Sequence, residues 1–415
     1  MNSIRKILIV TDSIDIEDSS GSKANVALIH NLAAAGYDIE VYHYTLREIS
    51  LKDVKTHAIK EIKYSPLYFL SRIQRVLSRR FNIEMSHFLQ GIFGFSFTFF
   101  NDAHSIVKAL KNNKFDPDLV MTLSKGSSFR PHYALLELPG FHNKWMAYVH
   151  DPFPFHFYPR PYNWIESSYR QKENFFREVS EKARYSAFPS LLLMEWMGSY
   201  FENFLKTGIL IPHQNADYEV KDIAFPHYFD ETKFNLLHAG NLMKQRSPEG
   251  LLKGFVKFLE NNPDVRPDSR LLLIGAADYH LEMLENYKKF EPEIYLKTSG
   301  LAFDTVFNLQ KNADVNIILE SKSEISPFLP AKFPHCVSAN KIILSLAPYY
   351  SETRRLLGHD YPFWSEADDV EKIAGLIEKL YMAWKYDKQN LLLNRNDLKE
   401  YLSADYLRTA IEKLR

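Results

Sequence analysis

The sequence has only one cysteine and no excess of charge of either sign. A single thiol, Cys336, cannot form an internal disulfide or a zinc cluster, and such sparse cysteine is typical of a reducing compartment. Lysine plus arginine number 51 and aspartate plus glutamate also number 51, so the formal net charge is zero. No global positive field would then draw the chain to nucleic acid. We therefore expect a cytoplasmic protein that does not bind nucleic acid.

Long apolar runs are scarce as well. Only four strongly apolar residues (7–10) follow Arg5 and Lys6, which is too few for a signal peptide. The most apolar longer window, 91–100, has about half the length needed to cross a bilayer. We therefore expect a soluble protein without a membrane span.

The chain does contain enough apolar residues to fold. Hydrophobic residues make up 46% of its 415 residues and aromatic residues make up 14%, which excludes a disordered chain. At about 150 residues per domain, this length suggests two or three domains.

The first half of the sequence alternates short apolar runs with helical patterns. Continuous apolar runs of this length are typical of parallel strands that are buried on both faces. We expect strands at 6–10, 37–45, 118–124, 144–151 and 184–190. A helix from about Lys23 to the cap residue Gly36 joins the first two. Strands alternating with helices predict a doubly wound parallel sheet in an N-terminal domain, residues 1–215.

The same alternation begins again after a polar stretch near 215–230, which is a candidate linker. Further strands are expected at 235–242, 271–276, 294–300, 315–320 and 341–348. The fold class is therefore α/β, with a second Rossmann-like domain over 230–395 that faces the first across a cleft. We expect residues 396–415 to form a C-terminal helix that packs back toward the N-terminal domain. Ligands of such sheets bind outside the carboxyl ends of the strands, so the residues after each strand are the informative ones.

The loop after the first strand ends in small residues, Gly21 and Ser22 among them, at the start of a helix. Backbone N–H groups at a helix N-terminus favour an anion, which makes this loop a candidate phosphate site. It is not a GxGxxG fingerprint, and no acid follows the second strand to bind a ribose, so a nicotinamide-dependent dehydrogenase is disfavoured. An ordinary capped turn is the alternative interpretation.

The corresponding loop of the second domain, 240–248, places Lys244 and Arg246 just before a helix. Two cations and free backbone donors would suit a diphosphate, which arginine can bind bidentately. The alternative is a solvated basic loop.

The segment 323–348 combines three prolines (327, 330 and 334), which predict a rigid, non-helical path, with three polar residues. Glu324 could hold ribose hydroxyls and Lys332 could neutralise a phosphate, with His335 beside them. A packing loop stiffened by proline is the alternative.

Polar residues also follow strands of the first domain. His150 and Asp151 come at the end of the strand 144–151, where they could orient or deprotonate a hydroxyl, and Arg160 lies in the aromatic segment that follows. Lys125 and Arg130 follow the strand at 118–124 and could line an acceptor site. A buried, hydrogen-bonded histidine under a proline-rich loop remains an equal alternative.

The stretch 70–81 has four arginines and an apolar stripe at helical spacing. A basic amphipathic helix can rest on an anionic membrane surface, which predicts peripheral association with the inner face of a membrane. A surface helix packed on the first domain is the alternative.

These residues resemble the GT-B glycosyltransferases, in particular the retaining, metal-independent group usually called glycosyltransferase family 4. The resemblance covers nearly the whole chain and is clearest in 238–255, 271–276 and 326–348. The last segment is similar to the family block P-S-K-L-F-E-Y-L-A-A-G-K-P-V-L, with Pro330 and Lys332 matching. The strand end 149–153 is similar to the one that bears His and Asp beside the acceptor in this family.

The resemblance implies roles for several residues. Gly21 and Ser22 would contact the donor phosphate, Arg246 would bind the diphosphate with the help of Lys332, and the loop around Ser299 would meet the base. His150, with Asp151, would lie near the transferred sugar and the acceptor.

The chain also departs from the family pattern. His335 stands where the family has a ribose-binding Glu, and Asn241 stands where an Arg or Lys is usual. Asn340 and Ile342 replace a Gly and a Pro, and Glu324 lies within a residue or two of the family's earlier Glu.

The function implied is transfer of a sugar from a nucleotide-diphosphate sugar to a hydroxyl acceptor, either a saccharide or a lipid-linked one, in bacterial cell-surface glycan or glycolipid synthesis. No cofactor is expected, and no metal, because neither candidate loop carries an Asp-x-Asp pair. Two alternatives remain, a nucleotide-sugar binding protein with impaired catalysis and a GT-B-like nucleotide-sugar epimerase.

Overall fold

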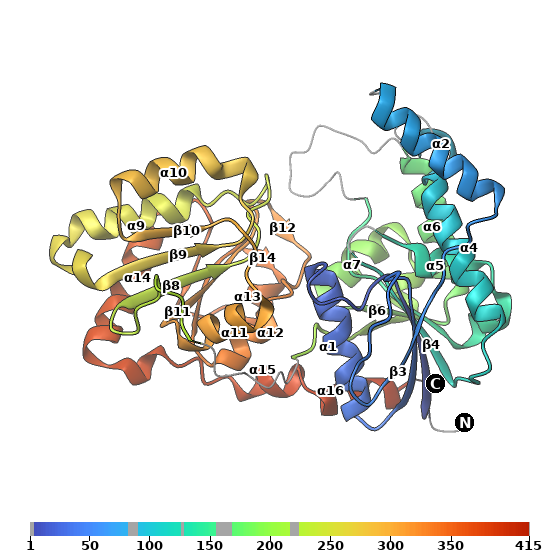
Figure 1. Ribbon diagram of the computed structural model, residues 1–415. Helices are drawn as coiled ribbons and strands as arrows, with labels where there is room; N and C mark the ends of the chain where they lie inside the picture. Colours follow the sequence, from blue (N-terminus) through green and yellow to red (C-terminus); the bar gives the residue numbers. More distant parts are fainter. Residues whose placement is uncertain (1–3, 82–89, 126–127, 155–167, 216–223, 415) are drawn as a thin grey trace. The chain divides into compact units, whose positions relative to one another are not determined.

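The computed structural model describes residues 4–81, 90–125, 128–154, 168–215 and 224–414. The chain divides into two compact units. The first holds the described residues up to Gln214 together with 403–414, and the second holds those from Asn215 to Leu402 (Figure 1).

The first unit is built on a parallel sheet of seven strands in the order β3-β2-β1-β4-β5-β6-β7. Its strands are β1 (Lys6–Thr11), β2 (Asp38–His43), β3 (Lys55–Ala58), β4 (Leu119–Leu123), β5 (Trp145–Tyr148), β6 (Tyr185–Phe188) and β7 (Gly208–Leu210). Its helices are α1 (Ser20–Ala34), α2 (Pro66–Phe81), α4 (Phe97–Lys111), α5 (Arg130–Leu136), η1 (Pro139–Lys144), α6 (Tyr169–Lys182), α7 (Leu191–Tyr200), α8 (Asn203–Lys206) and α16 (Ala404–Glu412).

Alternation along the central strand explains the two cores of this unit. Ile7 and Ile9 of β1 belong to one buried cluster, while Leu8 and Val10 belong to another. Successive side chains of a strand point to opposite faces of its sheet, so both faces are covered by apolar residues. This is the doubly wound arrangement that the continuous apolar runs predict.

Helix α1 begins at Ser20 rather than near Lys23. The Ser19 side chain caps the helix by accepting the backbone N–H of Ser22 at 3.1 Å, which satisfies a donor that the first turn leaves free. At the other end the chain turns at Gly36, which has a φ of +93°, a conformation open to glycine.

The last helix, α16, belongs to the first unit although it follows the whole second unit in sequence. Leu407 and Ile411 are fully buried in the same cluster as β1 and α1. Arg408 donates through Nε to the carbonyl of Ala35 at 2.9 Å. The stretch 396–415 is not one helix, because the Ser403 side chain caps a new helix there by accepting the N–H of Tyr406.

The second unit has a parallel sheet of six strands in the order β10-β9-β8-β11-β13-β15 and a two-stranded sheet, β12-β14. Its strands are β8 (Phe234–Ala239), β9 (Ser269–Ile274), β10 (Ile294–Lys297), β11 (Val315–Leu319), β12 (Ile325–Ser326), β13 (Ile342–Leu346), β14 (Tyr350–Ser351) and β15 (Trp364–Ser365). Its helices are α9 (Glu249–Asn261), η3 (Pro263–Asp268), η4 (Asp278–His280), α10 (Leu281–Phe290), α11 (Phe303–Asn312), α12 (Phe333–Ala339), α13 (Glu352–Leu357), α14 (Val370–Tyr386), η5 (Lys388–Leu391) and α15 (Asn396–Tyr401).

The prediction of a non-helical path through the three prolines is wrong at its end. Pro334 lies in the first turn of α12, where the missing N–H removes no helical hydrogen bond. The helix ends at Asn340, whose φ of +54° places it in the left-handed region. Lys332 is therefore held at the N-terminal end of a short helix rather than in an irregular loop.

The strand order reverses at one place in each large sheet, between β1 and β4 in the first unit and between β8 and β11 in the second. Crevices form at the carboxyl ends of the strands where the order reverses, because the connections leave in opposite directions there. The two predicted Rossmann-like sheets are thus confirmed, and each has one such place for a ligand.

Candidate functional site

The carboxyl ends of β8 and β11 bring together residues that are far apart in the sequence. His238 lies near the end of β8 and is fully buried, and Gly240 follows the strand directly. Glu320 follows β11 and is 3% exposed. These residues therefore surround the reversal point of the second sheet.

Lys332 projects into this group from the start of α12. Its Nζ lies 3.5 Å from both ring nitrogens of His238. Burial, and next the nearby Arg246, lower the pKa of Lys332 to about 7. Burial also lowers the pKa of His238 well below its ordinary value, with Lys332 and Arg246 adding to the effect. The imidazole is therefore neutral near pH 7, and a ring nitrogen without a proton can accept a hydrogen bond from the ammonium.

Gly240 leaves the space that Lys332 occupies. A Cβ atom at Gly240 would lie 2.6 Å from the Nζ of Lys332, and the φ of Gly240 is +155°. The backbone after β9 lies equally close to Gly240, because a Cβ atom at Gly275 would be 2.5 Å from the Gly240 carbonyl oxygen. Both glycines are thus required by the close approach of backbone and side chain at this strand end.

Arg246 completes the positive group. Its Nη1 donates to the carbonyl of Asn241 at 3.1 Å, which turns the side chain back over the loop after β8. The charge of Arg246 lowers the pKa values of both Lys332 and Glu320, so the guanidinium lies near each of them. Lys244, in contrast, is exposed to solvent. The structure brings Arg246 and Lys332 together and leaves Lys244 outside.

Glu320 is the acid of this site. Burial raises its pKa to about 7, while the Ser326 hydroxyl, which donates to Oε2, and Thr353 favour the charged form. A carboxyl group with such a pKa can give or take a proton near neutral pH. The site as a whole offers the side chains of Arg246 and Lys332 to an anion of more than one charge.

The other predicted donor residues lie around this group with different partners. The Asn241 Oδ1 accepts the backbone N–H of Ala276 at 3.2 Å. His335 packs against the rings of Phe303 and Phe307, with centroid distances of 5.3 and 5.6 Å. Ser299, after β10, and Glu324, before β12, are exposed. Their predicted contacts with base and ribose remain predictions.

In the first unit, the predicted phosphate loop is engaged in capping. The N–H of Ser22 is taken by the Ser19 side chain, and the two hydroxyl groups lie 3.0 Å apart. Gly21 lies between them in the first turn of α1 and is partly exposed. The role of these residues toward a donor phosphate stays a prediction.

His150 and Asp151 follow β5 as predicted, but they do not form a hydrogen-bonded pair. Within the part of the chain that the structure describes, neither the His150 Nε2 nor the Asp151 Oδ2 has a hydrogen-bond partner. The His150 ring instead stacks on His213 at 5.6 Å. Burial lowers the pKa of His150 well below its ordinary value and raises that of Asp151 to about 6. Near pH 7 the pair is therefore a neutral imidazole beside a carboxylate.

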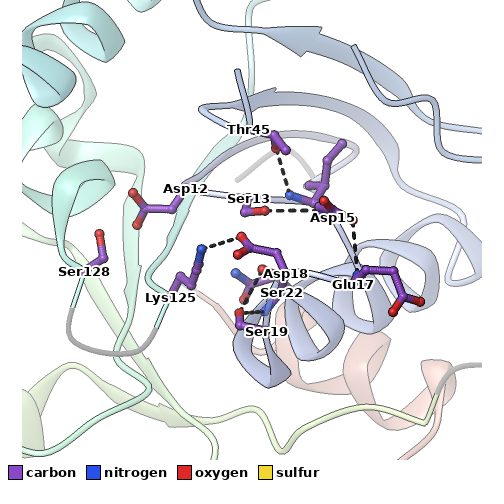
Figure 2. A network of polar contacts seen from close by, with 12 residues as sticks. Asp12, Ser13, Asp15, Glu17, Asp18, Ser19, Ser22, Thr45, Lys125 and Ser128 are labelled. Carbon is purple, nitrogen blue, oxygen red and sulfur yellow. Dashed lines mark hydrogen bonds and ion pairs between the residues drawn. The ribbon is translucent and has the colours of Figure 1, made fainter. Parts of the chain in front are cut away.

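The two predicted acceptor-side cations that are described both lie in ion pairs. Lys125 points toward Asp18 and pairs with it (Figure 2). Arg130 lies 2.9 Å from Asp102 through Nε and 3.4 Å from Asp12 through Nη1. Arg160, the third, lies outside the described residues.

Three residues of these strand ends are missing from the sequence-based prediction: His238, Glu320 and Asp12. His238 is the last but one residue of β8, while Asp12 and Glu320 directly follow β1 and β11. A stricter use of the strand-end rule, counting polar residues in the final positions of each apolar run, would have found them.

Among the described residues no three His, Cys, Asp or Glu side chains are grouped as ligands of a metal ion. Within the same residues no helix combines the length and the apolar character that a membrane crossing requires.

This chain resembles known proteins in its structure, while comparison of its sequence finds no match. No protein-family model matches the sequence, and no curated protein matches it. Among solved structures, the chain is similar to an α,α-trehalose-phosphate synthase (UDP-forming) from Burkholderia xenovorans in complex with glucose-6-phosphate. That match has a TM-score of 0.66 and 10% identity, and covers 99% of each chain.

Two further solved structures have the same architecture. The trehalose-6-phosphate enzyme from E. coli bound with UDP-2-fluoro glucose has a TM-score of 0.61 and 9% identity, with 99% of each chain covered. WaaG, a glycosyltransferase involved in lipopolysaccharide biosynthesis, has a TM-score of 0.60 and 11% identity, covering 98% of this chain and 99% of that one. At such identities the likeness shows the fold, and the fold is GT-B, as predicted.

Proposed function

We propose that this protein is a glycosyltransferase that takes a sugar from a nucleotide-diphosphate donor and attaches it to a hydroxyl group of an acceptor. The observation that carries the proposal is the pair of cations, Arg246 and Lys332, at the reversal point of the second sheet of a GT-B fold. A diphosphate would replace the unfavourable contact between these two charges by attraction to both.

The same two residues supply the catalytic effect. Negative charge develops on the diphosphate as the bond to the sugar breaks, and fixed cations stabilise that charge most strongly in the transition state. Arg246 offers a planar set of donors that fits phosphate oxygens, and Lys332 offers a compact charge. We propose that these side chains act without a metal and that the reaction retains the anomeric configuration, as in glycosyltransferase family 4.

The remaining predicted residues would act around this centre. In the proposal, His150 and Asp151 lie near the acceptor hydroxyl, while Asn241, Ser299 and His335 lie near the nucleoside. The acceptor would be a saccharide or a lipid-linked saccharide of the bacterial cell surface, and the reaction would take place in the cytoplasm.

The experiment that tests this proposal combines binding with turnover. Calorimetry with UDP and GDP, followed by a transfer assay with a panel of sugar nucleotides, should show binding of one nucleotide and transfer of its sugar. In Arg246→Ala turnover should fall by at least about 100-fold, the usual loss when a preorganised charge stabiliser is removed. Near-native turnover in that variant would remove the diphosphate assignment.

A second variant tests the acceptor side. His150→Ala should abolish transfer and leave nucleotide binding intact, because the histidine belongs to the first unit and the cation pair to the second. Loss of nucleotide binding in this variant would show that the site has been misplaced.

One observation favours a second candidate, a GT-B-like nucleotide-sugar epimerase. Glu320 is buried directly after β11, near Arg246, and burial raises its pKa to about 7. A group that transfers protons near neutral pH needs such a pKa. Incubation of a sugar nucleotide without acceptor separates the two candidates. An epimerase would give an isomeric sugar nucleotide, whereas a transferase would give only slow hydrolysis or none.

We further propose that helix α2 places the protein on an anionic membrane. Phe69, Ile73 and Val76 form a stripe along α2, and each is more than half exposed. Ser71 and Gln74, on the opposite face, are buried where α2 packs on α4 (Figure 1). The same helix carries four arginines. Arg72 pairs with Glu61 and Arg75 donates to Thr98, while Arg79 and Arg80 in the last turn are exposed. Exposed apolar side chains beside cations fit a bilayer that carries negative lipids.

Co-sedimentation with vesicles tests the membrane proposal. The protein should sediment with vesicles that contain phosphatidylglycerol and not with phosphatidylcholine alone. The double variant Ile73→Ser/Val76→Ser should lose this binding while keeping nucleotide affinity. Equal binding to both kinds of vesicle, or undiminished binding of the variant, would reject the proposal.

A further inference from the structure

A cavity of about 610 Å³ lies at the carboxyl end of β1 in the first unit. Asp12 and Ser13, which follow β1, form one side of it, and Lys125, which follows β4, forms another. These strands are neighbours at the place where the order of the first sheet reverses. The volume is within the range of small-molecule sites, roughly 300–1,000 Å³.

We propose that this cavity binds the acceptor, that the acceptor is a neutral or amino-bearing polyhydroxyl compound such as an unphosphorylated sugar, and that Asp12 holds one of its hydroxyl or ammonium groups. This inference rests on the proposed transferase function, since only a transferase needs an acceptor. Its failure can still be recognised separately, because acceptor binding and nucleotide binding use different units of the chain.

The charges around the cavity exclude an anionic acceptor. Each of its three cationic side chains is engaged by a carboxylate, in the pairs Lys125 with Asp18, Arg47 with Asp15, and Arg130 with Asp102 and Asp12. Five carboxylates line the cavity against these three cations. A phosphate group that entered would have to displace a carboxylate from its cation and would lie among the remaining acids. Neutral hydroxyl groups, or an ammonium group, meet no such repulsion.

Asp12 presents a buried carboxylate to the cavity. It is only 6% exposed, and its Oδ1 faces Arg130 at 3.4 Å. Its Oδ2 has no partner in hydrogen-bonding geometry among the described residues, and the Ser128 hydroxyl nearby favours the charged form. A buried carboxylate oxygen without a donor is costly and rare, and the hydroxyl of a bound sugar would supply the missing donor. Burial raises the pKa of Asp12 to about 6, so near pH 7 the group is still an acceptor of hydrogen bonds.

The rim of the cavity adds an apolar surface. Leu46 is 61% exposed and has a φ of +64°, an unusual conformation for a bulky residue. Tyr44, two residues earlier, is buried, and its hydroxyl donates to Asp102 at 2.8 Å. The C–H face of a sugar ring packs well on such side chains, while its hydroxyl groups reach the polar wall. Polar and apolar surfaces thus meet in one cavity.

Saturation-transfer NMR on the full chain tests the proposal. The probes are glucose, galactose, mannose and N-acetylglucosamine, glucosamine and galactosamine, and the 6-phosphates of glucose, mannose and glucosamine. At least one unphosphorylated sugar should bind and no sugar phosphate should. Asp12→Asn should weaken the binding of that sugar at least about tenfold, because a charged acceptor is lost. Asp116→Asn, which changes an exposed carboxylate outside the cavity, is the matched control.

A gain of function tests the charge argument directly. The double variant Asp15→Asn/Asp18→Asn frees Arg47 and Lys125, so glucose 6-phosphate should now bind. Preferred binding of sugar phosphates by the unaltered protein, no binding of any sugar, no effect of Asp12→Asn, or no gain in the double variant would each overturn the proposal. UDP and GDP affinities are measured on the same samples, to distinguish failure of the acceptor inference from failure of the transferase proposal. If a nucleotide binds, only the acceptor inference has failed, and if none binds, the transferase proposal has failed as well.

Discussion

The two large sheets reverse their strand order in the same way, yet the crevices at these places have opposite electrostatic character. In the second unit, Arg246 and Lys332 lie close enough that each charge disfavours the other, and Glu320 is the acid beside them. In the first unit, every cation that lines the cavity is paired with a carboxylate, and the acids are in excess.

If the proposed function holds, this difference lets one architecture serve two ligands. The parallel sheet determines where a ligand can lie, because polar residues follow the strand ends in both units. Side chains then decide what the ligand is, and the excess charge is positive in one crevice and negative in the other. Under the proposed function, a donor that carries a diphosphate would favour the crevice of the second unit, and an acceptor without a phosphate would favour that of the first.

Among the changes in nucleotide affinity, the largest is expected when the charge of Lys332 is removed. In Lys332→Met the Kd for the bound nucleoside diphosphate should rise roughly 10- to 100-fold, since a charge-assisted hydrogen bond contributes about 1.5–3 kcal/mol. The matched change in the other crevice, Lys125→Met, should alter this Kd by less than about twofold, because Asp18 already neutralises that lysine. Calorimetry measures both. Similar losses in the two variants would abolish the contrast between the crevices.

The pH dependence of nucleotide affinity should follow, with a somewhat smaller effect. The pKa of Lys332 is lowered to about 7, so the free protein loses this charge as the pH rises through 7. Affinity for the diphosphate should therefore fall about tenfold between pH 6 and pH 8, because only the protonated lysine binds well. Deprotonation of Glu320 over the same range acts in the same direction.

The control for this prediction is the variant that lacks the titrating group. In Lys332→Met most of the dependence should vanish, and what remains reflects Glu320 and the nucleotide's own phosphate. An affinity of the unaltered protein that rises from pH 6 to pH 8 would contradict the assignment.

A smaller loss is expected when the backbone beside the lysine is altered. Gly240→Ala places a methyl group 2.6 Å from the Lys332 Nζ, so the side chain must move, and nucleotide affinity should fall about fivefold. Gly375→Ala, in an open position of α14, is the matched control and should not change affinity. Both variants are titrated with the same nucleotide. An unchanged affinity in Gly240→Ala would mean that the surrounding backbone does not fix the position of the Lys332 side chain.

The smallest effect belongs to the paired, exposed cation of the first unit. Arg47→Gln removes the partner of Asp15 at the rim of the cavity, where the arginine side chain is 62% exposed. Solvent-exposed pairs contribute little, so thermal unfolding and nucleotide affinity should both stay within experimental error. A clear loss of nucleotide affinity would show that the first crevice takes part in donor binding after all.

Much of the architecture was predictable because it depends on periodicity. Mostly apolar runs, such as residues 6–10 and 315–320, identify parallel strands directly, and the alternation with helices gives the doubly wound sheets. Short edge elements were missed, including β3, β12 and β14, because two to four residues carry too little pattern. At Pro334 the error was the opposite one, because a helix formed where none was predicted. In the sequence, a proline in the first turn of a helix cannot be told from one that prevents a helix.

The site was harder to predict than the fold. Position after a strand drew attention to Arg246 and Lys332, and the structure brings these two side chains near each other. The sequence could not reveal that Lys125 and Arg130 are neutralised, because their partners are more than 25 residues away along the chain. Nor could it reveal which polar atoms are buried without a partner, as the Asp12 Oδ2 is, since burial depends on the packed tertiary structure.

The place of α16 has a consequence for how the protein is made. A ribosome synthesises the whole second unit before Leu407 and Ile411, and these two side chains fill part of the first unit's core against β1 and α1. Until then the nascent first unit exposes the apolar surface that they will cover. The order of completion is therefore the reverse of the usual one, in which the N-terminal domain finishes first, and the emerging chain needs protection at that surface throughout its synthesis.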